Sequence, residues 1–207
     1  MAPAPHAQPL REEEADPTPL GQFARWYREA EAADVAMPEA MALATATPQG
    51  APSVRMVLLK GFDADGFRFF SNADSRKGRE LDANARAGLL FHWPALGRQV
   101  RIEGRVERLP RAETERYARS RPRGSQLSAL ASPQSEVVQD RAWLERRVEE
   151  LERRHAGEPV PVHPSWTGYR LAPELYEFWQ NRDDRLHDRL RYRPAGGGRW
   201  TLERLAP

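Results

Sequence analysis

Alternating apolar and polar residues along the chain predict a protein built mainly of antiparallel strands. Residues 98–109, RQVRIEGRVERL, place Val100, Ile102 and Val106 on one face and polar side chains on the other. Residues 40–47, 67–72 and 87–93 are further strand candidates, and residues 53–62, SVRMVLLKGF, are apolar on both faces, as a central strand would be. The DADG turn that follows predicts a hairpin into residues 67–72.

Three more strands are expected near the C-terminus, at residues 168–180, 185–194 and 199–207. The second of them begins with RLHDRL, and a strand there would place Arg185, His187 and Arg189 on one face. Because a half-buried face normally carries apolar side chains, two explanations are open. The three residues face an electron-rich or anionic ligand, or they belong to an edge strand with solubilising charge.

Helices are expected between and around these strands. Thr18 and Pro19 are typical of a helix start, Ser75 of a short helix through RKGRELDANA, and RAETERYARSR of a helix that ends at Pro122. A long amphipathic helix is expected over about residues 138–156. The six or seven strands show no strand–helix–strand rhythm, which argues against a parallel sheet. We therefore expect a mainly β fold with peripheral helices (α+β), a closed or partly closed barrel, in one domain over residues 18–207.

Composition narrows the class of protein. The chain has 207 residues, of which 40% are hydrophobic and 30% charged, with a net charge of +2. Basic and acidic residues are interleaved, so no nucleic-acid partner is expected. There are no cysteines and no H-E-x-x-H pair, so no metal site is expected. No apolar run approaches membrane-spanning length, and residues 1–17 are polar and proline-rich. We expect a cytoplasmic protein without membrane contact and with a disordered start.

Two helix-linked segments are candidates for anion binding. In SRKGREL, Arg76 and Lys77 lie in a first helical turn, where cations oppose the helix dipole unless an anion binds there. In ERYARSRPRGSQ, Tyr117 and Arg121 share a helix face, and Ser125 follows the break at Pro122. A phenol, a guanidinium and a hydroxyl in one place suit a phosphate ester. Taken alone, each segment is better explained as a solvated basic surface.

The 53–62 segment carries two further candidates. Arg55 and Lys60 lie at the two ends of its apolar stretch. Charged side chains at such positions usually extend to the rim of a sheet, which is also where a barrel binds ligands.

Together these segments resemble the pyridoxamine 5′-phosphate oxidase family, FMN enzymes that make pyridoxal 5′-phosphate. The similarity runs from about Phe23 to Pro207. It rests on eight blocks in the family's order, RMVLLKGFDADGFRFFSN, SRKGREL, RQVRIEGRVERL, SRPRGSQ, SPQS, EFWQ, RLHDRLRY and ERLAP. The resemblance implies an antiparallel FMN-binding split β-barrel of Greek-key type and a homodimer with FMN at the subunit interface.

The resemblance also implies roles for individual residues. The FMN contacts would come from Arg55, Met56, Val57, Leu58, Leu59, Lys60, Phe70, Ser71, Arg76, Lys77, Gln99, Gln134, Ser135, Trp179 and Arg189. The substrate contacts would come from Lys60, Tyr117, Arg121, Ser125, Arg185 and His187. Of these, Arg185 and His187 would be catalytic, orienting the pyridine ring and assisting proton movement at C4′. The implied reaction oxidises pyridoxamine or pyridoxine 5′-phosphate with oxygen and releases hydrogen peroxide.

The chain departs from the family pattern at several places. Its LREEEADP segment has Arg11 but no tyrosine, where the family often has an Arg/Tyr segment that helps cover the substrate. Phe70-Ser71 replaces the usual Tyr-Thr, Leu130 a common Trp, and His92 a frequent Pro. Two alternatives stay open: a split-barrel flavin oxidase with another substrate, such as a dihydrophenazine, and a flavin- or haem-binding module without catalysis.

Overall fold

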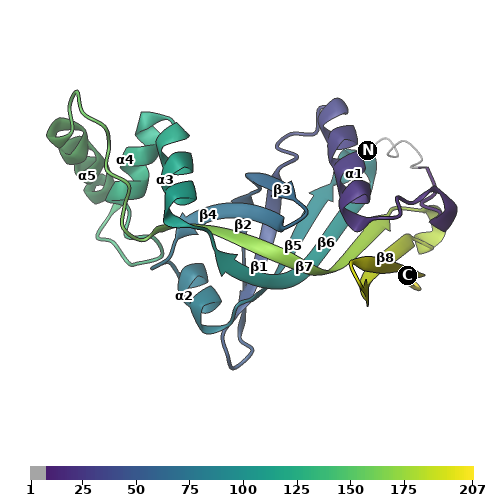
Figure 1. The fold of residues 1–207 in the computed structure, drawn as a ribbon. Helices are drawn as coiled ribbons and strands as arrows, with labels where there is room; N and C mark the ends of the chain where they lie inside the picture. The colour runs from purple at the N-terminus through teal and green to yellow at the C-terminus, as the bar shows by residue number, and fades with distance from the viewer. Residues whose placement is uncertain (1–7) are drawn as a thin grey trace.

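The strands form one curled antiparallel sheet, with helices packed at its ends (Figure 1). The structure is a computed structural model that describes residues 8–207. Within these residues there are nine strands: β1 (Ala40–Ala46), β2 (Pro52–Leu58), β3 (Gly61–Asp63), β4 (Gly66–Asn72), β5 (Arg86–Trp93), β6 (Arg98–Arg108), β7 (Trp166–Gln180), β8 (Asp188–Gly196) and β9 (Arg199–Arg204). The expected mainly β, antiparallel fold with peripheral helices is confirmed.

Strand β7 is the centre of the sheet. One of its edges pairs with β6 along most of its length, while the other pairs first with β4 and then with β8. The strand order is β2-β1-β5-β6-β7-β4-β3, and β9 extends the sheet beyond β8. A bulge between Glu103 and Gly104 bends the β6–β7 pair. A Cβ atom at Gly104 would lie 2.0 Å from the Ala172 carbonyl oxygen, so the close approach at the bend requires glycine.

Five α-helices lie within residues 8–207: α1 (Pro19–Ala32), α2 (Arg76–Ala83), α3 (Arg111–Ser120), α4 (Arg123–Ala131) and α5 (Arg141–Arg154). The predicted starts of α1 and α2 are confirmed, because Thr18 and Ser75 each accept a hydrogen bond from a backbone N–H in the first turn. Helix α4 was not predicted; it begins directly after the Pro122 that ends α3. No helix in this part of the chain is long and apolar enough to cross a membrane.

Aromatic packing holds α1 against the sheet. Phe23 of α1, Phe67 of β4 and Phe91 of β5 are fully buried, and the Phe23 ring lies 4.9 and 5.0 Å from the other two ring centroids. A separate small apolar cluster joins α4 to α5 through Leu127 and Leu151. In Figure 1, α3, α4 and α5 gather at one end of the sheet, and α1 lies across the other.

The prediction of a central strand over residues 53–62 is wrong. The segment divides at Leu59 and Lys60 into β2 and β3, and β2 lies at one end of the strand order. Val54 and Met56 of β2 are 69% and 63% exposed. Apolar residues on both faces of a strand predict that both faces are covered, but they do not show that the same chain covers them.

The prediction that RLHDRL is a strand with three basic residues on one face is also wrong. Strand β8 begins only at Asp188, and Arg185 belongs to a 3₁₀ turn, Asp183–Arg185. Asp184 and Arg185 have φ angles of +56° and +60°. This left-handed backbone is incompatible with an extended strand and is costly for residues other than glycine.

The expected disorder of residues 1–17 is wrong for residues 8–17; residues 1–7 lie outside the described part of the chain. Leu10 is buried, and its backbone N–H donates to Asp188 Oδ2 (3.1 Å). The Arg204 guanidinium binds both carboxylate oxygens of Glu12 at 2.7 Å. These partners lie almost the whole chain length away, so the local composition of the segment could not reveal them.

We predict that the packing of residues 8–17 against the rest of the protein stabilises it. Leu10→Ala should lower the free energy of unfolding by about 2 to 3 kcal/mol, because it removes a buried side chain and leaves a cavity. Thermal unfolding at one fixed protein concentration would measure this. The control is Glu13→Ala in the same turn, where the side chain is exposed. Equal melting temperatures for the two variants would contradict the packed segment.

Candidate active site

A cavity of about 280 Å³ opens between β2, β4, α2, α3 and the start of β7. It is lined by Arg55, Met56, Val57, Leu58, Lys60, Phe70, Ser71, Lys77, Tyr117, Arg121, Gln134 and Trp166. Four of these lining residues are cations, and none is a carboxylate. This charge pattern favours an anionic ligand.

Lys77 is the most deeply placed cation of the cavity. Only 9% of the residue is exposed, and its ammonium donates hydrogen bonds to Gln134 Oε1 (2.8 Å), Ser71 Oγ (3.0 Å) and Ser75 Oγ (3.2 Å). All three acceptors are neutral. Burial, and secondly the nearby positive charge of Arg55, lower the pKa of Lys77 from 10.5 to about 8. A phosphate group at this point would supply the missing negative charge.

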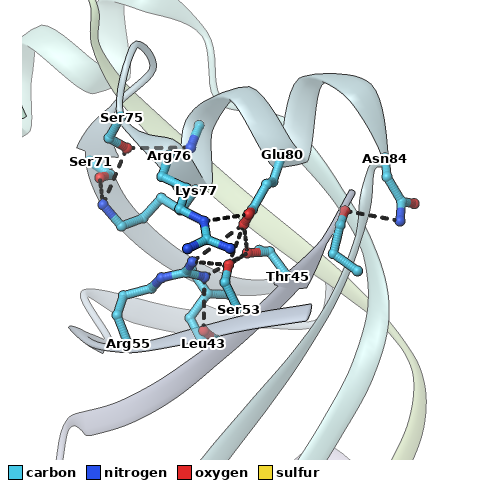
Figure 2. Close-up of polar contacts among 12 residues, drawn as sticks. Leu43, Thr45, Ser53, Arg55, Ser71, Ser75, Arg76, Lys77, Glu80 and Asn84 are labelled. Carbon is cyan, nitrogen blue, oxygen red and sulfur yellow. Dashed lines mark hydrogen bonds and ion pairs between the residues drawn. The ribbon is translucent and has the colours of Figure 1, made fainter. Parts of the chain in front are cut away.

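Glu80, which sequence analysis missed, lies behind the cavity and connects β1, β2 and α2 (Figure 2). Its Oε2 accepts hydrogen bonds from Thr45, Ser53 and Arg55, and its Oε1 accepts one from Arg76 at 2.9 Å. Burial raises the pKa of Glu80, but the hydrogen bonds from Ser53, Thr45 and Arg76 outweigh it and lower the pKa to about 2. The ionised carboxylate fixes the Arg55 guanidinium beside the cavity.

Arg76 does not line the cavity. Its guanidinium is paired with Glu80, and 59% of its side chain is exposed. The pair is a four-residue helical spacing within SRKGREL, so the sequence held a signal for it. The first helical turn therefore divides its two cations: Lys77 lies in the cavity, and Arg76 binds the acid behind it.

The opposite wall of the cavity contains aromatic and cationic side chains. The Tyr117 ring stacks on Phe70 with 3.8 Å between centroids, and the Arg121 guanidinium lies 4.6 Å over the Trp166 ring. Burial raises the pKa of Tyr117 above its usual 10, so its hydroxyl stays a neutral donor at pH 7. The expected juxtaposition of Tyr117 and Arg121 is thus present. No sequence pattern had marked Trp166.

A second group of predicted residues gathers where β7 meets β6 and β8. In the sheet register Trp179 lies opposite Gln99 on one side and Arg189 on the other. The His187 ring lies 4.5 Å from the Trp179 ring, and Arg189 donates to the buried carboxylate of Glu177 (2.9 Å). None of these residues lines the 280 Å³ cavity.

The turn before β8 is held by hydrogen bonds that also define the form of His187. The backbone N–H of Arg182 donates to His187 Nδ1 (3.2 Å), so the neutral imidazole carries its proton on Nε2. Asp188 anchors the turn from behind, because its carboxylate accepts from the N–H of Leu10 and from Arg204 (2.7 Å). The strained Arg185 lies between these anchors.

The two groups lie at opposite ends of one strand. Trp166 begins β7 in the cavity, and Trp179 lies near its other end. At ~3.3 Å per residue they are roughly 40 Å apart along the strand. The cavity and the group around Trp179 are therefore separate regions of the chain, with no lining residue in common.

Besides Arg76, three predicted residues lie outside both groups. Leu59 is buried in the main core. Ser125 is in the first turn of α4 and does not line the cavity. Ser135 follows the cavity residue Gln134 with a φ of +75° and does not line the cavity either.

Comparison with known proteins places this geometry in a family. Residues 28–155 match the family model described as pyridoxamine 5′-phosphate oxidase. Residues 166–207 match the model described as pyridoxine 5′-phosphate oxidase C-terminal dimerisation region.

Two curated relatives carry the name pyridoxine/pyridoxamine 5′-phosphate oxidase. The protein of Rubrobacter xylanophilus is 56% identical over 96% of this chain and 91% of its own length. The protein of Bordetella pertussis is 54% identical over 96% of this chain and 93% of its own length.

Solved structures agree on the fold. PhzG from Burkholderia lata, in complex with tetrahydrophenazine-1-carboxylic acid, is 34% identical, with a TM-score of 0.90 over 98% of this chain and all of its own. An FMN-binding protein from Nostoc punctiforme shares the fold at 18% identity, with a TM-score of 0.72 over 92% of this chain and 98% of its own. The chain therefore belongs to the pyridoxamine 5′-phosphate oxidase family of split-barrel flavin oxidoreductases.

Proposed function

We propose that this protein oxidises pyridoxamine or pyridoxine 5′-phosphate to pyridoxal 5′-phosphate, with oxygen as the acceptor and hydrogen peroxide as the by-product. The observation that carries the proposal is the lining of the cavity. Lys60, Tyr117 and Arg121 line it together with Lys77, which comes from a different segment of the chain than any of them. The cavity contains donors for two phosphate groups, one on the cofactor and one on the substrate. The names of the relatives at 52–56% identity support the same activity.

The residues around Lys77 fit the phosphate of FMN. Its ammonium has only neutral hydrogen-bond partners, since Ser71 Oγ and Gln134 Oε1 accept from it, and the Arg55 guanidinium adds N–H donors beside it. When bound, FMN supplies the redox chemistry, taking a hydride equivalent from the substrate and passing the electrons to oxygen. Ser71 and Gln134 would keep the ammonium aimed at the phosphate, and Glu80 would keep Arg55 in place.

We place the complete site between two copies of the chain. The separation along β7 means that Trp179, His187 and Arg189 of one subunit would complete the cavity of the other. An apolar groove of about 530 Å³, lined by residues such as Ala42, Val54 and Leu89, lies on the outer face of β1, β2 and β5. Together with exposed Met56, it offers a surface for a second subunit.

In this arrangement Arg185 and His187 act on the substrate ring. The Nε2–H of His187 would donate to the amino or hydroxyl group at C4′ or to the ring substituent beside it, while Arg185 holds the ring in place. The hydrogen bond from the Arg182 N–H to Nδ1 would orient the His187 ring before substrate arrives.

A second candidate is oxidation of a reduced phenazine, because PhzG shares the fold over the full chain. Two observations favour the phosphorylated pyridine. Identity to PhzG is 34%, against 56% to the Rubrobacter relative, and the cavity keeps the three donors Lys60, Tyr117 and Arg121.

Peroxide release by the purified flavin-loaded protein tests the function. We expect turnover of pyridoxamine 5′-phosphate and pyridoxine 5′-phosphate that exceeds turnover of a dihydrophenazine by at least tenfold in kcat/KM. Preference for the dihydrophenazine would establish the second candidate instead, and no turnover of any of them would contradict both.

The lowered pKa of Lys77 predicts how FMN binding depends on pH. In the free protein Lys77 loses its charge above about pH 8, whereas a bound phosphate keeps the ammonium protonated. Between about pH 7 and 8, where the phosphate is fully ionised, the FMN association constant should be flat, and above pH 8 it should fall by up to tenfold per pH unit. Flavin fluorescence titration of the apoprotein measures this. Riboflavin, which lacks the phosphate, is the control ligand, and Lys77→Met should abolish the pH dependence for FMN.

Arg121→Met tests the substrate phosphate. A charge-assisted hydrogen bond contributes about 1.5 to 3 kcal/mol, so kcat/KM for pyridoxine 5′-phosphate should fall by about one to two powers of ten. Activity on pyridoxine and the FMN content should barely change. Equal losses on both substrates would assign Arg121 to the fold or the chemistry, and loss of FMN would assign it to the cofactor phosphate.

A further inference from the structure

Strand pairing and hydrogen bonds hold the main chain of Trp166 in place. It begins β7 opposite Asn72 of β4, its N–H donates to the His163 carbonyl (2.9 Å), and its own carbonyl accepts from Arg111 of α3 (3.1 Å). Only 9% of the residue is exposed, yet it lines the cavity. The main chain of Trp166 is therefore fixed, and its buried indole, whose N–H has no partner among the described residues, forms part of the cavity wall.

The Arg121 backbone is held by hydrogen bonds to Ala118 and from Gln126, but its guanidinium has no comparable anchor within residues 8–207. It follows the last residue of α3 and precedes Pro122, which holds its backbone extended (ψ 152°) and outside the helix. Among residues 8–207, no carboxylate or carbonyl oxygen accepts a hydrogen bond from its guanidinium. The described contact of the charged group is the face of Trp166, at 4.6 Å.

Stacking on a ring has a specific consequence for a guanidinium. It occupies the flat face of the group by a cation–π contact and leaves the N–H donors at its edge unpaired. Those donors then keep a fixed plane, which suits bidentate binding of a phosphate. A lysine, or an arginine without the ring, would have to lose side-chain conformational freedom when it binds the phosphate.

We propose that Trp166 is the positioning residue that makes the site selective for phosphorylated ligands, because it holds the Arg121 guanidinium ready to bind the phosphate. The proposal rests on the proposed function in that the phosphate belongs to the substrate. It adds a residue that determines specificity without touching the reacting atoms.

The decisive measurement is binding without turnover. The probes are 4-deoxypyridoxine 5′-phosphate, which lacks the oxidisable C4′ hydroxyl, and the same compound without phosphate. In the FMN-loaded protein, Trp166→Met should raise the Kd of the phosphorylated probe five- to tenfold and change that of the other probe less than twofold. Trp166→Phe, which keeps an aromatic face but not the indole N–H, should stay within about threefold of the wild type. Equal weakening of both probes would overturn the proposal, since it indicates a general structural role.

A double-variant cycle separates positioning from loss of structure. Once Arg121 is methionine, Trp166→Met should cause no further loss for the phosphorylated probe, because the group that it positions is gone. Additive losses would overturn the proposal.

If Trp166→Met fails to fold, Arg121→Lys tests the same idea, because it leaves Trp166 in place. It retains the charge but cannot present a stacked fork, so a five- to tenfold weaker Kd for the phosphorylated probe is expected. Unchanged affinity would overturn the proposal.

Because these are equilibrium measurements, they hold whether or not the enzyme turns over pyridoxine 5′-phosphate. Absence of turnover with intact, Trp166-dependent probe binding would contradict the proposed function alone.

Discussion

Strand pairing on both edges of β7 is the constraint on which the arrangement of the site depends. The strand is hydrogen-bonded to β6 on one edge and to β4 and β8 in succession on the other. It therefore cannot fold back, and the residues at its two ends stay apart. In the proposed function, the cavity at Trp166 and the His187 group near Trp179 are two parts of one site, which a second copy of the chain would bring together.

Charge in the cavity depends on one acid placed outside it. Glu80 is buried and ionised, and it binds Arg55 and Arg76 through opposite carboxylate oxygens. A carboxylate inside the cavity would repel a phosphate, whereas one behind it orients the cations and offsets their mutual repulsion. Lys77 remains without an anionic partner among its hydrogen-bonding contacts, which leaves its ammonium available. Because Glu80 lies outside the cavity, the cations that line the cavity remain available to bind an anionic ligand.

Sequence patterns correctly predicted the features that depend on interactions between residues close in sequence. The cap at Ser75, the hairpin before β4 and the alternating face of β6 all follow from short-range rules, and each is present. The RLHDRL prediction failed because of the left-handed backbone at Asp184 and Arg185, whereas other failures involve partners remote in sequence. Residues 8–17 are ordered by Asp188 and Arg204, and the apolar β2 lies at an edge. Trp166 gave no signal, because its role depends on an arginine from another element.

In the proposed function, differences in burial would let one cavity hold two phosphates that stay bound for different times. Lys77 is enclosed by Ser71, Ser75 and Gln134, so a phosphate bound there would leave only by breaking an enclosed set of bonds. Arg121 is half-buried and rests on a ring, and so can release its ligand without disturbing the hydrogen bonds of its neighbours. In the proposed function the enclosed site suits a resident cofactor and the open one a substrate that exchanges at every turnover. Arginine on an aromatic face fits the second role, because it provides orientation without providing enclosure.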